Sequence, residues 1–395
     1  MRVRYYCHAG QETGYGRAAT ELAIALVEAG VDLTLHPLNP SLSHFVEGPA
    51  AALASRVSDI AGPADAVIIH TMPLDCQRVV ESLLLDHERP RTIIAYTTWE
   101  GVTAPPLVID ALRNFHDLWV PSIATADDIL ESTMAAMNPY VLPHTFTPRA
   151  HPTARPNGSL DERFRFYYVG AWTVRKHVHG LIRAFAHAFQ PEEPVELVIH
   201  SPGVSTESFL AALVQTGLEQ RHLPSIVLSN RHVAEDRLWQ LHEQADCFVT
   251  ATRGESWNLP AFEAMLSGRM VIAPGGQGHD DFLFGEDDDE MTDAYRVASV
   301  HQPAFVDVEM AEQAMGPGGE RGLKFHTVGA QGMTSRTLWR DPDLVHLARG
   351  MRRVFDERRR TLDVRYDPAE RFGHATVAKM AIDRIEDFMA VVEDG

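Results

Sequence analysis

The chain has 395 residues, of which 45% are hydrophobic and 23% are charged, and its formal net charge is −19. This composition is typical of a soluble globular protein, and the length predicts two domains rather than one. The acidic excess argues against general binding to nucleic acids or anionic membranes, because such binding requires a basic surface.

Cysteine usage and hydropathy both favour the cytoplasm. The three cysteines, Cys7, Cys76 and Cys247, are far apart in the sequence, so neither disulfides nor a structural zinc site is expected. The first residues lack the apolar run of a signal peptide, and no uncharged stretch approaches the roughly 20 residues that span a bilayer. We therefore expect a cytoplasmic protein without a transmembrane segment.

In the first part of the chain, short apolar segments alternate with helical patterns. Strands are predicted at residues 3–7, 31–36, 66–69, 92–96 and 118–120, and helices at 17–29, 78–85, 107–115 and 124–137. This alternation predicts a parallel sheet with helices on both faces. The loop before the first helix contains Gly14 and Gly16 but no G-x-G-x-x-G pattern. Either the backbone of this loop approaches a phosphate or a sugar closely, or the loop is a plain tight turn.

Two polar residues fall at the carboxyl ends of predicted strands, where open parallel sheets bind ligands. His70 follows the strand at 66–69, and Glu100, preceded by Trp99, follows the strand at 92–96. The alternative is that His70 is a hydrogen-bonded structural histidine and that Glu100 takes no part in a site.

Residues 147–163 are rich in proline, glycine and polar residues and are predicted to link the two domains. A second alternating series follows. Its strands are predicted at 164–169, 195–200, 226–228, 246–250 and 271–273, and its helices at 174–189, 206–216, 235–244, 342–360 and 369–392. Arg175 and Lys176 stand at a predicted helix start, where two cations oppose the helix dipole. Either a bound anion removes this conflict, or they are simply two exposed cations.

The stretch 246–276 predicts a strand, a loop, a helix and a second strand. Asn258 is expected to cap the helix and Gly268 to end it in a left-handed conformation. Glu255 in the loop and Glu263 on the helix flank the helix start, whose free N–H groups can bind phosphate. Carboxylates beside a phosphate site suit a nucleotide-sugar, which carries hydroxyl-rich rings on both sides of a diphosphate. The alternative is that both are solvated surface residues, with Glu263 favoured near a helix N-terminus.

Residues 255–268 read E-S-W-N-L-P-A-F-E-A-M-L-S-G. This string resembles the donor-binding segment of the retaining, GT-B-fold glycosyltransferases of family 4, E-G-F/W-G-L-P-x-x-E-A-M-A-x-G, although two glycines are replaced here. The resemblance implies that Glu255 faces the donor sugar and that Glu263 holds the nucleotide ribose. It also implies that the donor site includes the residues that follow Glu255, namely Ser256, Trp257, Asn258 and Leu259.

The string G-A-W-T-V-R-K-H stands where the same family has G-R-x(n)-R-K-G. The resemblance implies that Lys176 and Arg175 grip the diphosphate of the donor. Ala171 replaces the first arginine of the family pattern, so that role falls to Arg175 or is lost.

Two strings in the first half also resemble this family. G-Y-G-R-A-A-T-E-L-A resembles its glycine loop, which implies that Gly14 and Gly16 lie at the donor site. T-W-E-G-V-T-A-P-P has a counterpart that would put Trp99 and Glu100 on the acceptor side. In family members, a histidine at the place of His70 lies close to the donor sugar.

The expected fold is α/β of the GT-B type, with two Rossmann-like domains whose parallel sheets face each other across a cleft. The first domain is expected at 1–146 and the nucleotide-sugar-binding domain at 164–366. A C-terminal helix at 367–395 is expected to cross back onto the first domain.

The expected activity is transfer of a sugar from a nucleotide-diphosphate sugar to an unidentified acceptor hydroxyl, with retention of anomeric configuration. No cofactor and no metal are expected, because Lys176 and Arg175 can stabilise the departing diphosphate. Three alternatives stay open: a GT-B-fold epimerase or hydrolase acting on nucleotide-sugars, a binding module that has lost turnover, and a transferase whose acceptor is a DNA base.

The sequence also contains one acidic run and one basic cluster. The acidic run 286–290, with Asp280 and Asp281 nearby, is interpreted as a solvated loop rather than a metal site. Six arginines between 349 and 360 form a basic cluster on one predicted helix. Such a run is usually a solvated face, and it is the best candidate in this sequence for an anionic acceptor or a membrane surface.

Overall fold

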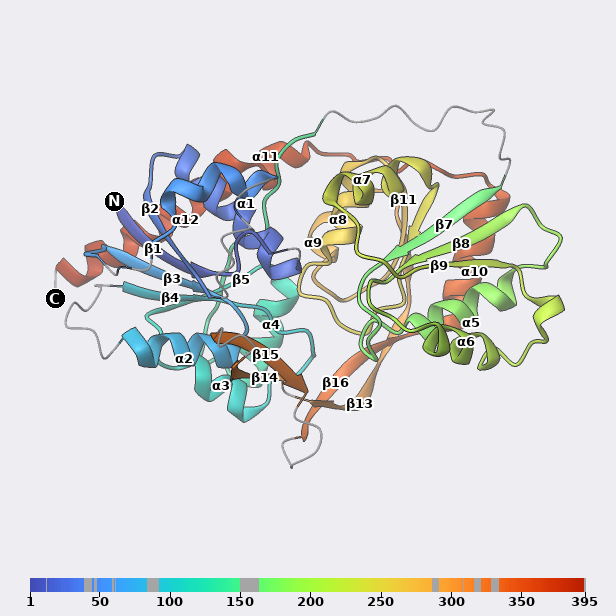
Figure 1. Ribbon diagram of the computed structural model, residues 1–395, viewed down its shortest axis with the longest axis horizontal. Coiled ribbons are helices and arrows are strands. Elements are labelled where there is room, and N and C mark those ends of the chain that lie inside the picture. Colours follow the sequence, from blue (N-terminus) through green and yellow to red (C-terminus); the bar gives the residue numbers. More distant parts are fainter. Residues whose placement is uncertain are drawn as a thin grey trace. The chain divides into compact units, whose positions relative to one another are not determined.

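The computed structural model describes residues 1–11, 13–38, 45, 48–58, 60, 62–83, 92–149, 163–285, 291–307, 309–315, 321–327 and 334–393. The chain divides into two compact units, whose elements are labelled in Figure 1. Unit 1 comprises Met1–Pro148, Pro303–Leu338 and Asp367–Gly395, and unit 2 comprises Arg149–Gln302 and Trp339–Tyr366. Most of the predicted linker, residues 150–162, lies outside the described residues.

Unit 1 contains a six-stranded parallel sheet with the strand order β2-β1-β3-β4-β5-β6. Its strands are β1 (Arg2–Cys7), β2 (Asp32–Pro37), β3 (Ala66–His70), β4 (Thr92–Tyr96), β5 (Asp117–Val120) and β6 (Tyr140–Val141). Every residue of β3 and β4 is buried, as expected for parallel strands covered on both faces. The predicted parallel sheet is confirmed.

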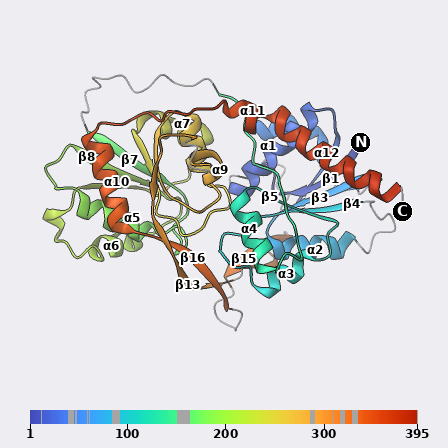
Figure 2. The same cartoon turned by 180° about the vertical axis from the view of Figure 1, so that it is seen from behind.

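The helices of unit 1 cover this sheet, and the last of them comes from the C-terminal end of the chain. They are α1 (Gly14–Glu28), the 3-10 helix η2 (Pro49–Arg56), α2 (Pro73–Leu83), α3 (Pro106–Leu112), α4 (Ile123–Ser132), α11 (Pro368–Phe372) and α12 (His374–Glu393). Helix α12 packs beside α1 (Figures 1 and 2). Its Val377, Ala381 and Ile385 share a hydrophobic core with Tyr5 of β1.

Helix α1 begins three residues before the predicted start. The Thr13 hydroxyl accepts a hydrogen bond from the Gly16 N–H at 3.0 Å, so Thr13 is the N-cap. Gly14 and Gly16 therefore lie in the first helical turn and not in the preceding loop. A Cβ added to Gly16 would lie 2.2 Å from the carbonyl oxygen of Gln11, so close backbone packing by itself requires glycine there.

Unit 2 contains a second six-stranded parallel sheet, in the order β12-β11-β10-β7-β8-β9. Its strands are β7 (Phe164–Val169), β8 (Val195–His200), β9 (Ser225–Ser229), β10 (Cys247–Val249), β11 (Met270–Pro274) and β12 (Tyr295–Val297). Its helices are α5 (Val178–Ala188), α6 (Thr206–Val214), the 3-10 helix η3 (Gln220–His222), α7 (Glu235–Gln244), α8 (Leu259–Leu266), α9 (Asp280–Leu283) and α10 (Leu344–Asp356).

Among the described residues, four further strands follow β12, in a stretch for which we predicted no strand from the sequence. They are β13 (Ser299–Asp307), β14 (Glu309–Met315), β15 (Arg321–Thr327) and β16 (Thr334–Pro342). β14 and β15 pair in antiparallel fashion, and β13 pairs with β16. The second domain was expected to run unbroken over 164–366, whereas the structure groups Pro303–Leu338 with unit 1. Among the helices that the structure describes, none is long and apolar enough to cross a membrane.

Candidate active site

Sheet topology brings two loops together in unit 2. Strand β7 lies between β8 and β10, so the chain leaves β7 and β10 in loops that start at the same carboxyl edge. From β7 the chain continues to β8 and β9 on one side, and it then returns to β10 on the other side of β7. Open α/β sheets bind ligands at the point where the strand order reverses in this way. The loop after β7 carries Arg175 and Lys176, and the loop after β10 carries Glu255.

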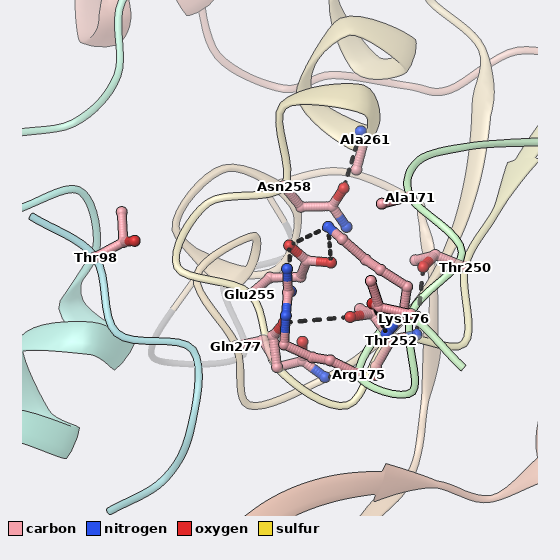
Figure 3. A network of polar contacts seen from close by, with 12 residues as sticks. Thr98, Ala171, Arg175, Lys176, Thr250, Thr252, Glu255, Asn258, Ala261 and Gln277 are labelled. Carbon is pink, nitrogen blue, oxygen red and sulfur yellow. Dashed lines mark hydrogen bonds and ion pairs between the residues drawn. The ribbon is translucent and has the colours of Figure 1, made fainter. Parts of the chain in front are cut away.

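Glu255 forms ion pairs with both cations of the neighbouring loop (Figure 3). The Lys176 Nζ donates to Oε1 and Oε2 of Glu255 at 2.6 and 2.8 Å. The Arg175 Nη1 lies 3.4 Å from Oε2 and donates to the carbonyl oxygen of Gly254 at 2.5 Å. One carboxylate therefore holds two cations at the carboxyl edge of the sheet.

Burial alone would raise the pKa of the Glu255 carboxyl, but Lys176 and Arg175 outweigh it and hold this pKa well below its ordinary value. Glu255 therefore remains an anion at neutral pH. Only 7% of Glu255 and 4% of Glu263 is exposed, so the alternative that they are solvated surface residues is wrong.

The two cations do not stand on a helix. Helix α5 begins at Val178, not at 174 as predicted, and His177 before it has a left-handed backbone with φ of 50°. Arg175 and Lys176 therefore do not oppose the dipole of α5, and no bound anion is needed to relieve such a conflict. The alternative of two exposed cations is also wrong, because side-chain exposure is only 22% and 15%.

The helix predicted after Glu255 is confirmed as α8. Asn258 is its N-cap, with a left-handed backbone, and its Oδ1 accepts a hydrogen bond from Ala261 N–H at 3.4 Å (Figure 3). Gly268 follows the helix with φ of 66°, as predicted. Trp257 is buried and packs against the rings of Phe262 and Phe282, so it serves the core of unit 2. Among the other predicted donor-site residues, Ser256 is buried and Leu259 is half-buried.

Glu263 faces a histidine of the neighbouring helix α7. Its Oε2 lies 3.4 Å from the Nε2 of His242, which is fully buried. The Nδ1 of the same ring lies 2.7 Å from the hydroxyl of Tyr167 on β7. A chain of polar contacts therefore connects the sheet to the predicted ribose-binding carboxylate.

Gln277 is a site residue that the sequence analysis did not single out. Its Nε2 donates to the carbonyl oxygen of Thr252 at 3.0 Å, and Gly278 N–H donates to the carbonyl oxygen of Glu255 at 2.8 Å. With its amide nitrogen fixed in this way, Oε1 of Gln277 is buried and has no partner among the described residues. The sequence did contain a signal for Gln277, because this residue follows Gly275-Gly276 just after the carboxyl end of β11. The carboxyl ends of the strands form the edge at which open parallel sheets bind ligands.

The predicted residues of unit 1 lie at the carboxyl edge of its own sheet. His70 ends β3 and is 1% exposed. Trp99 is half-buried against the core formed around α2, α3 and β4, and Glu100 is half-buried beside it in the sequence. Burial raises the pKa of the Tyr15 hydroxyl, and the nearby Glu100 raises it further, which places Glu100 near the start of α1.

The two charged runs have different outcomes. Four of the six arginines of the basic cluster form ion pairs within unit 2: Arg352 with Glu193 and Asp356, Arg353 with Glu357, Arg359 with Asp293, and Arg360 with Asp246. These ion pairs partly neutralise the cluster, and its role towards an anionic acceptor or a membrane surface stays a prediction. The acidic run 286–290 lies outside the described residues, and within the described ranges no three His, Cys, Asp or Glu side chains gather as a metal site would require.

The chain is similar to known proteins in sequence and in fold. Residues 163–298 match the family model described as "Glycosyl transferases group 1". No curated protein matches the sequence.

Several solved structures share the fold. The lipopolysaccharide outer core galactosyltransferase WaaB superposes with a TM-score of 0.61 at 13% identity, over 98% of this chain and 99% of that one. HepE of Anabaena, solved with UDP-glucose, gives a TM-score of 0.61 at 12% identity, over 98% and 100%. A mutant of S. aureus TarM, solved with UDP, gives 0.50 at 11% identity over 81% of this chain, which spans only 55% of that structure.

At such low identity these likenesses establish the fold alone, whereas the family match concerns the segment that holds Arg175, Lys176, Glu255 and Glu263. Residues 163–298 match the model of the group 1 glycosyl transferases, and the two six-stranded parallel sheets give the chain the fold of the GT-B glycosyltransferases.

Proposed function

We propose that this protein transfers a sugar from a nucleoside-diphosphate sugar to an acceptor hydroxyl, with retention of anomeric configuration and without a metal ion. The observation that carries the proposal is the contact of Glu255 with Lys176 and Arg175 in a group 1 glycosyl transferase domain. Retention rests on the resemblance of residues 255–268 to the family 4 donor segment. HepE was solved with UDP-glucose, which makes UDP-sugars the first donors to test.

Each charged residue has a distinct role in this proposal. The diphosphate displaces part of the Glu255 contact and binds Lys176 and Arg175, whose charges stabilise the negative charge that grows on the leaving diphosphate. Glu255 then accepts hydrogen bonds from the donor sugar. Glu263 accepts them from the ribose, and the His242 ring limits the orientations of its carboxylate. His70 contributes a hydrogen bond to the substrate from unit 1.

The experiment combines donor identification with product analysis. A thermal-shift screen of nucleotide-sugars identifies the donor, because a ligand at 100 times its Kd stabilises the folded state by about 2.7 kcal/mol. Release of nucleoside diphosphate is then measured with and without candidate acceptors. Release that depends on acceptor supports transfer. Release in water alone indicates a hydrolase, conversion of the sugar without release indicates an epimerase, and binding without either indicates a module that has lost turnover.

Metal independence is tested separately, with EDTA in the transfer assay. Activity is expected to survive, because this proposal gives Lys176 and Arg175, the two cations paired with Glu255, the role of stabilising the diphosphate. Complete loss that Mn²⁺ or Mg²⁺ restores would contradict this part of the proposal. It would direct attention to the acidic run 286–290.

A further inference from the structure

The carboxyl edge of the unit 1 sheet holds a buried cluster of tyrosine and histidine side chains. Strand β1 lies between β2 and β3, so the order of connection reverses between β1 and β3. At this position the hydroxyl of Tyr5 on β1 lies 2.6 Å from Nδ1 of His70 on β3. Tyr5 is 0% exposed and His70 is 1% exposed. The ring of Tyr96 on β4 stacks on His70, with 4.1 Å between ring centroids.

Both partners of the Tyr5–His70 contact are neutral. Burial raises the pKa of the Tyr5 hydroxyl well above its ordinary value, so the hydroxyl keeps its proton. Burial, with the nearby His144 and His8, lowers the pKa of His70 well below its ordinary value. The imidazole therefore carries one proton, on Nδ1 or on Nε2.

The hydrogen-bond partners of the two His70 nitrogens indicate which of them carries the proton. Nδ1 of His70 is the partner recorded for the Tyr5 hydroxyl, and Nε2 of His70 has no partner among the residues that the structure describes. If Tyr5 donates to Nδ1, the hydroxyl proton is satisfied and only Nε2–H is left over. If instead Nδ1–H donated to Tyr5, the hydroxyl proton and the Nε2 lone pair would both be left over. A buried polar group without a partner is costly, so the first arrangement, which leaves one such group, is favoured over the second, which leaves two.

A second tyrosine–histidine pair on the same edge has the opposite proton arrangement. The Tyr96 hydroxyl lies 2.8 Å from the carbonyl oxygen of Leu142, which can only accept, so its proton points there. The Nδ1 of His144 lies 2.9 Å from the same hydroxyl and must therefore donate to it. His144 thus serves as an internal reference for the other tautomer.

We propose that Tyr5 is a positioning residue that holds His70 in the Nε2–H tautomer. His70 then offers a hydrogen-bond donor to a substrate oxygen and has no lone pair at Nε2 with which to remove a proton from an acceptor hydroxyl. The part of this inference that concerns substrate rests on the proposed function. The tautomer itself does not.

Nitrogen NMR of the isotope-labelled full chain tests the tautomer without any substrate. Near pH 6.5, where a free histidine titrates, His70 should remain neutral, with Nε2 protonated and Nδ1 unprotonated, and His144 should show the reverse. Tyr5→Phe keeps the ring and should reduce the Nε2–H population of His70. Tyr140→Phe removes another hydroxyl of unit 1, which donates to the carbonyl oxygen of Met380, and should leave His70 unchanged.

A wild-type spectrum with His70 protonated on Nδ1 overturns the proposal even if Tyr5→Phe does not fold. An unchanged His70 tautomer in folded Tyr5→Phe overturns it as well.

A double-mutant cycle tests the consequence for turnover once a donor and an acceptor are known. Tyr5→Phe should lower kcat/KM roughly two- to tenfold, the range expected for one net hydrogen bond. In the His70→Gln background the same change should have little further effect, because an amide has no tautomer. Equal effects in both backgrounds would show that Tyr5 acts only through packing. Absence of any transfer would refute the proposed function and leave the NMR result standing.

Discussion

At the scale of single residues, Glu255 offsets part of the positive charge of Lys176 and Arg175. Its carboxylate is matched by two cations, so this part of unit 2 carries one net positive charge from Glu255, Lys176 and Arg175. Under the proposed function, a diphosphate that binds here competes with Glu255 for Lys176. The family resemblance assigned the carboxylate to the sugar and the lysine to the phosphates, and it gave no indication that they contact each other.

This competition gives a prediction for Glu255→Gln. The amide keeps the shape of the side chain and removes the charge that engages Lys176, so nucleoside diphosphate alone should bind at least about twofold more tightly. Turnover should fall strongly, because the group that we propose to face the donor sugar is altered. Calorimetric titration of UDP and steady-state kinetics measure the two effects. Parallel losses of affinity and turnover would contradict the assigned role.

Lys176→Ala should lower kcat by about a hundred- to a thousandfold. Negative charge grows on the diphosphate as the glycosidic bond breaks, and loss of one preorganised donor to such a charge costs about 2.7–4 kcal/mol. Steady-state kinetics with the identified donor measures the loss.

The control is the double variant Lys176→Ala with Glu255→Gln. The single change leaves Glu255 buried with only Arg175 nearby, which is itself destabilising. The double variant restores the charge balance, so its melting temperature should recover while its activity stays low. Recovery of activity would show that Lys176 only compensates Glu255.

The sequence identified the principal residues of the candidate site but not their contacts. Lys176 and Glu255 are 79 positions apart, and their contact depends on the adjacency of β7 and β10, which no local pattern encodes. Gln277 follows Gly275-Gly276 at the carboxyl end of β11, which is a sequence signal for the ligand edge, but its hydrogen bond to Thr252 depends on the fold.

At the scale of elements, strands were predicted more accurately than helix starts. Short continuous apolar runs bounded by turn residues identified β3, β4, β7 and β8 to within one residue. Helix α1 starts earlier than expected because Thr13 caps a first turn containing two glycines, which are poor helix formers. Helix α5 starts later than predicted because His177 adopts a left-handed backbone conformation, which the local sequence does not predict.

The start of α12 is attached to α1 by a histidine between two carboxylates. His374 Nε2 lies 2.9 Å from Glu21 Oε2, and Nδ1 lies 2.8 Å from Glu28 Oε2. Burial alone would lower the pKa of His374, but the hydrogen bonds to Glu21 and Glu28 outweigh it and raise this pKa above its ordinary value. The charged imidazole therefore stabilises the contact between the two helices.

A folded-state pKa above the unfolded value means that this stabilisation is complete below the unfolded pKa, about 6.5, and is lost as the pH rises through the folded value. His374→Gln should therefore destabilise the protein by an amount on the order of 1 kcal/mol near pH 6, and by less near pH 8. Denaturant unfolding of both proteins at the two pH values measures the difference. A cost that is equal at both values, or larger near pH 8, would show that the imidazole is neutral in the folded protein.

At the scale of the whole molecule, the sequence predicted two units and the return of the C-terminal helix to the first of them, but it did not predict the grouping of Pro303–Leu338 with unit 1. Chain length and two α/β series predicted two sheets. Pro303–Leu338 groups with unit 1 through contacts such as the hydrogen bonds of Val102 N–H to the carbonyl oxygen of Leu338 and of the Thr337 hydroxyl to the carbonyl oxygen of Thr103. The glycines and polar residues of this stretch give no periodic signal.

This division gives a prediction for where a nucleotide acts. Every residue assigned to the diphosphate or the ribose, namely Arg175, Lys176 and Glu263, belongs to unit 2. Binding of UDP alone should therefore slow hydrogen exchange in the loop 170–177 and in 250–263, because bound ligand suppresses local opening. Peptides covering β3 and β4 should exchange as in the free protein. Lys176→Ala, which removes a proposed phosphate contact, should lose most of the protection at 170–177 under the same UDP concentration. Protection that appears first or most strongly in the β3 and β4 peptides would place the nucleotide in unit 1 and overturn the assignment of unit 2 as the donor-binding unit.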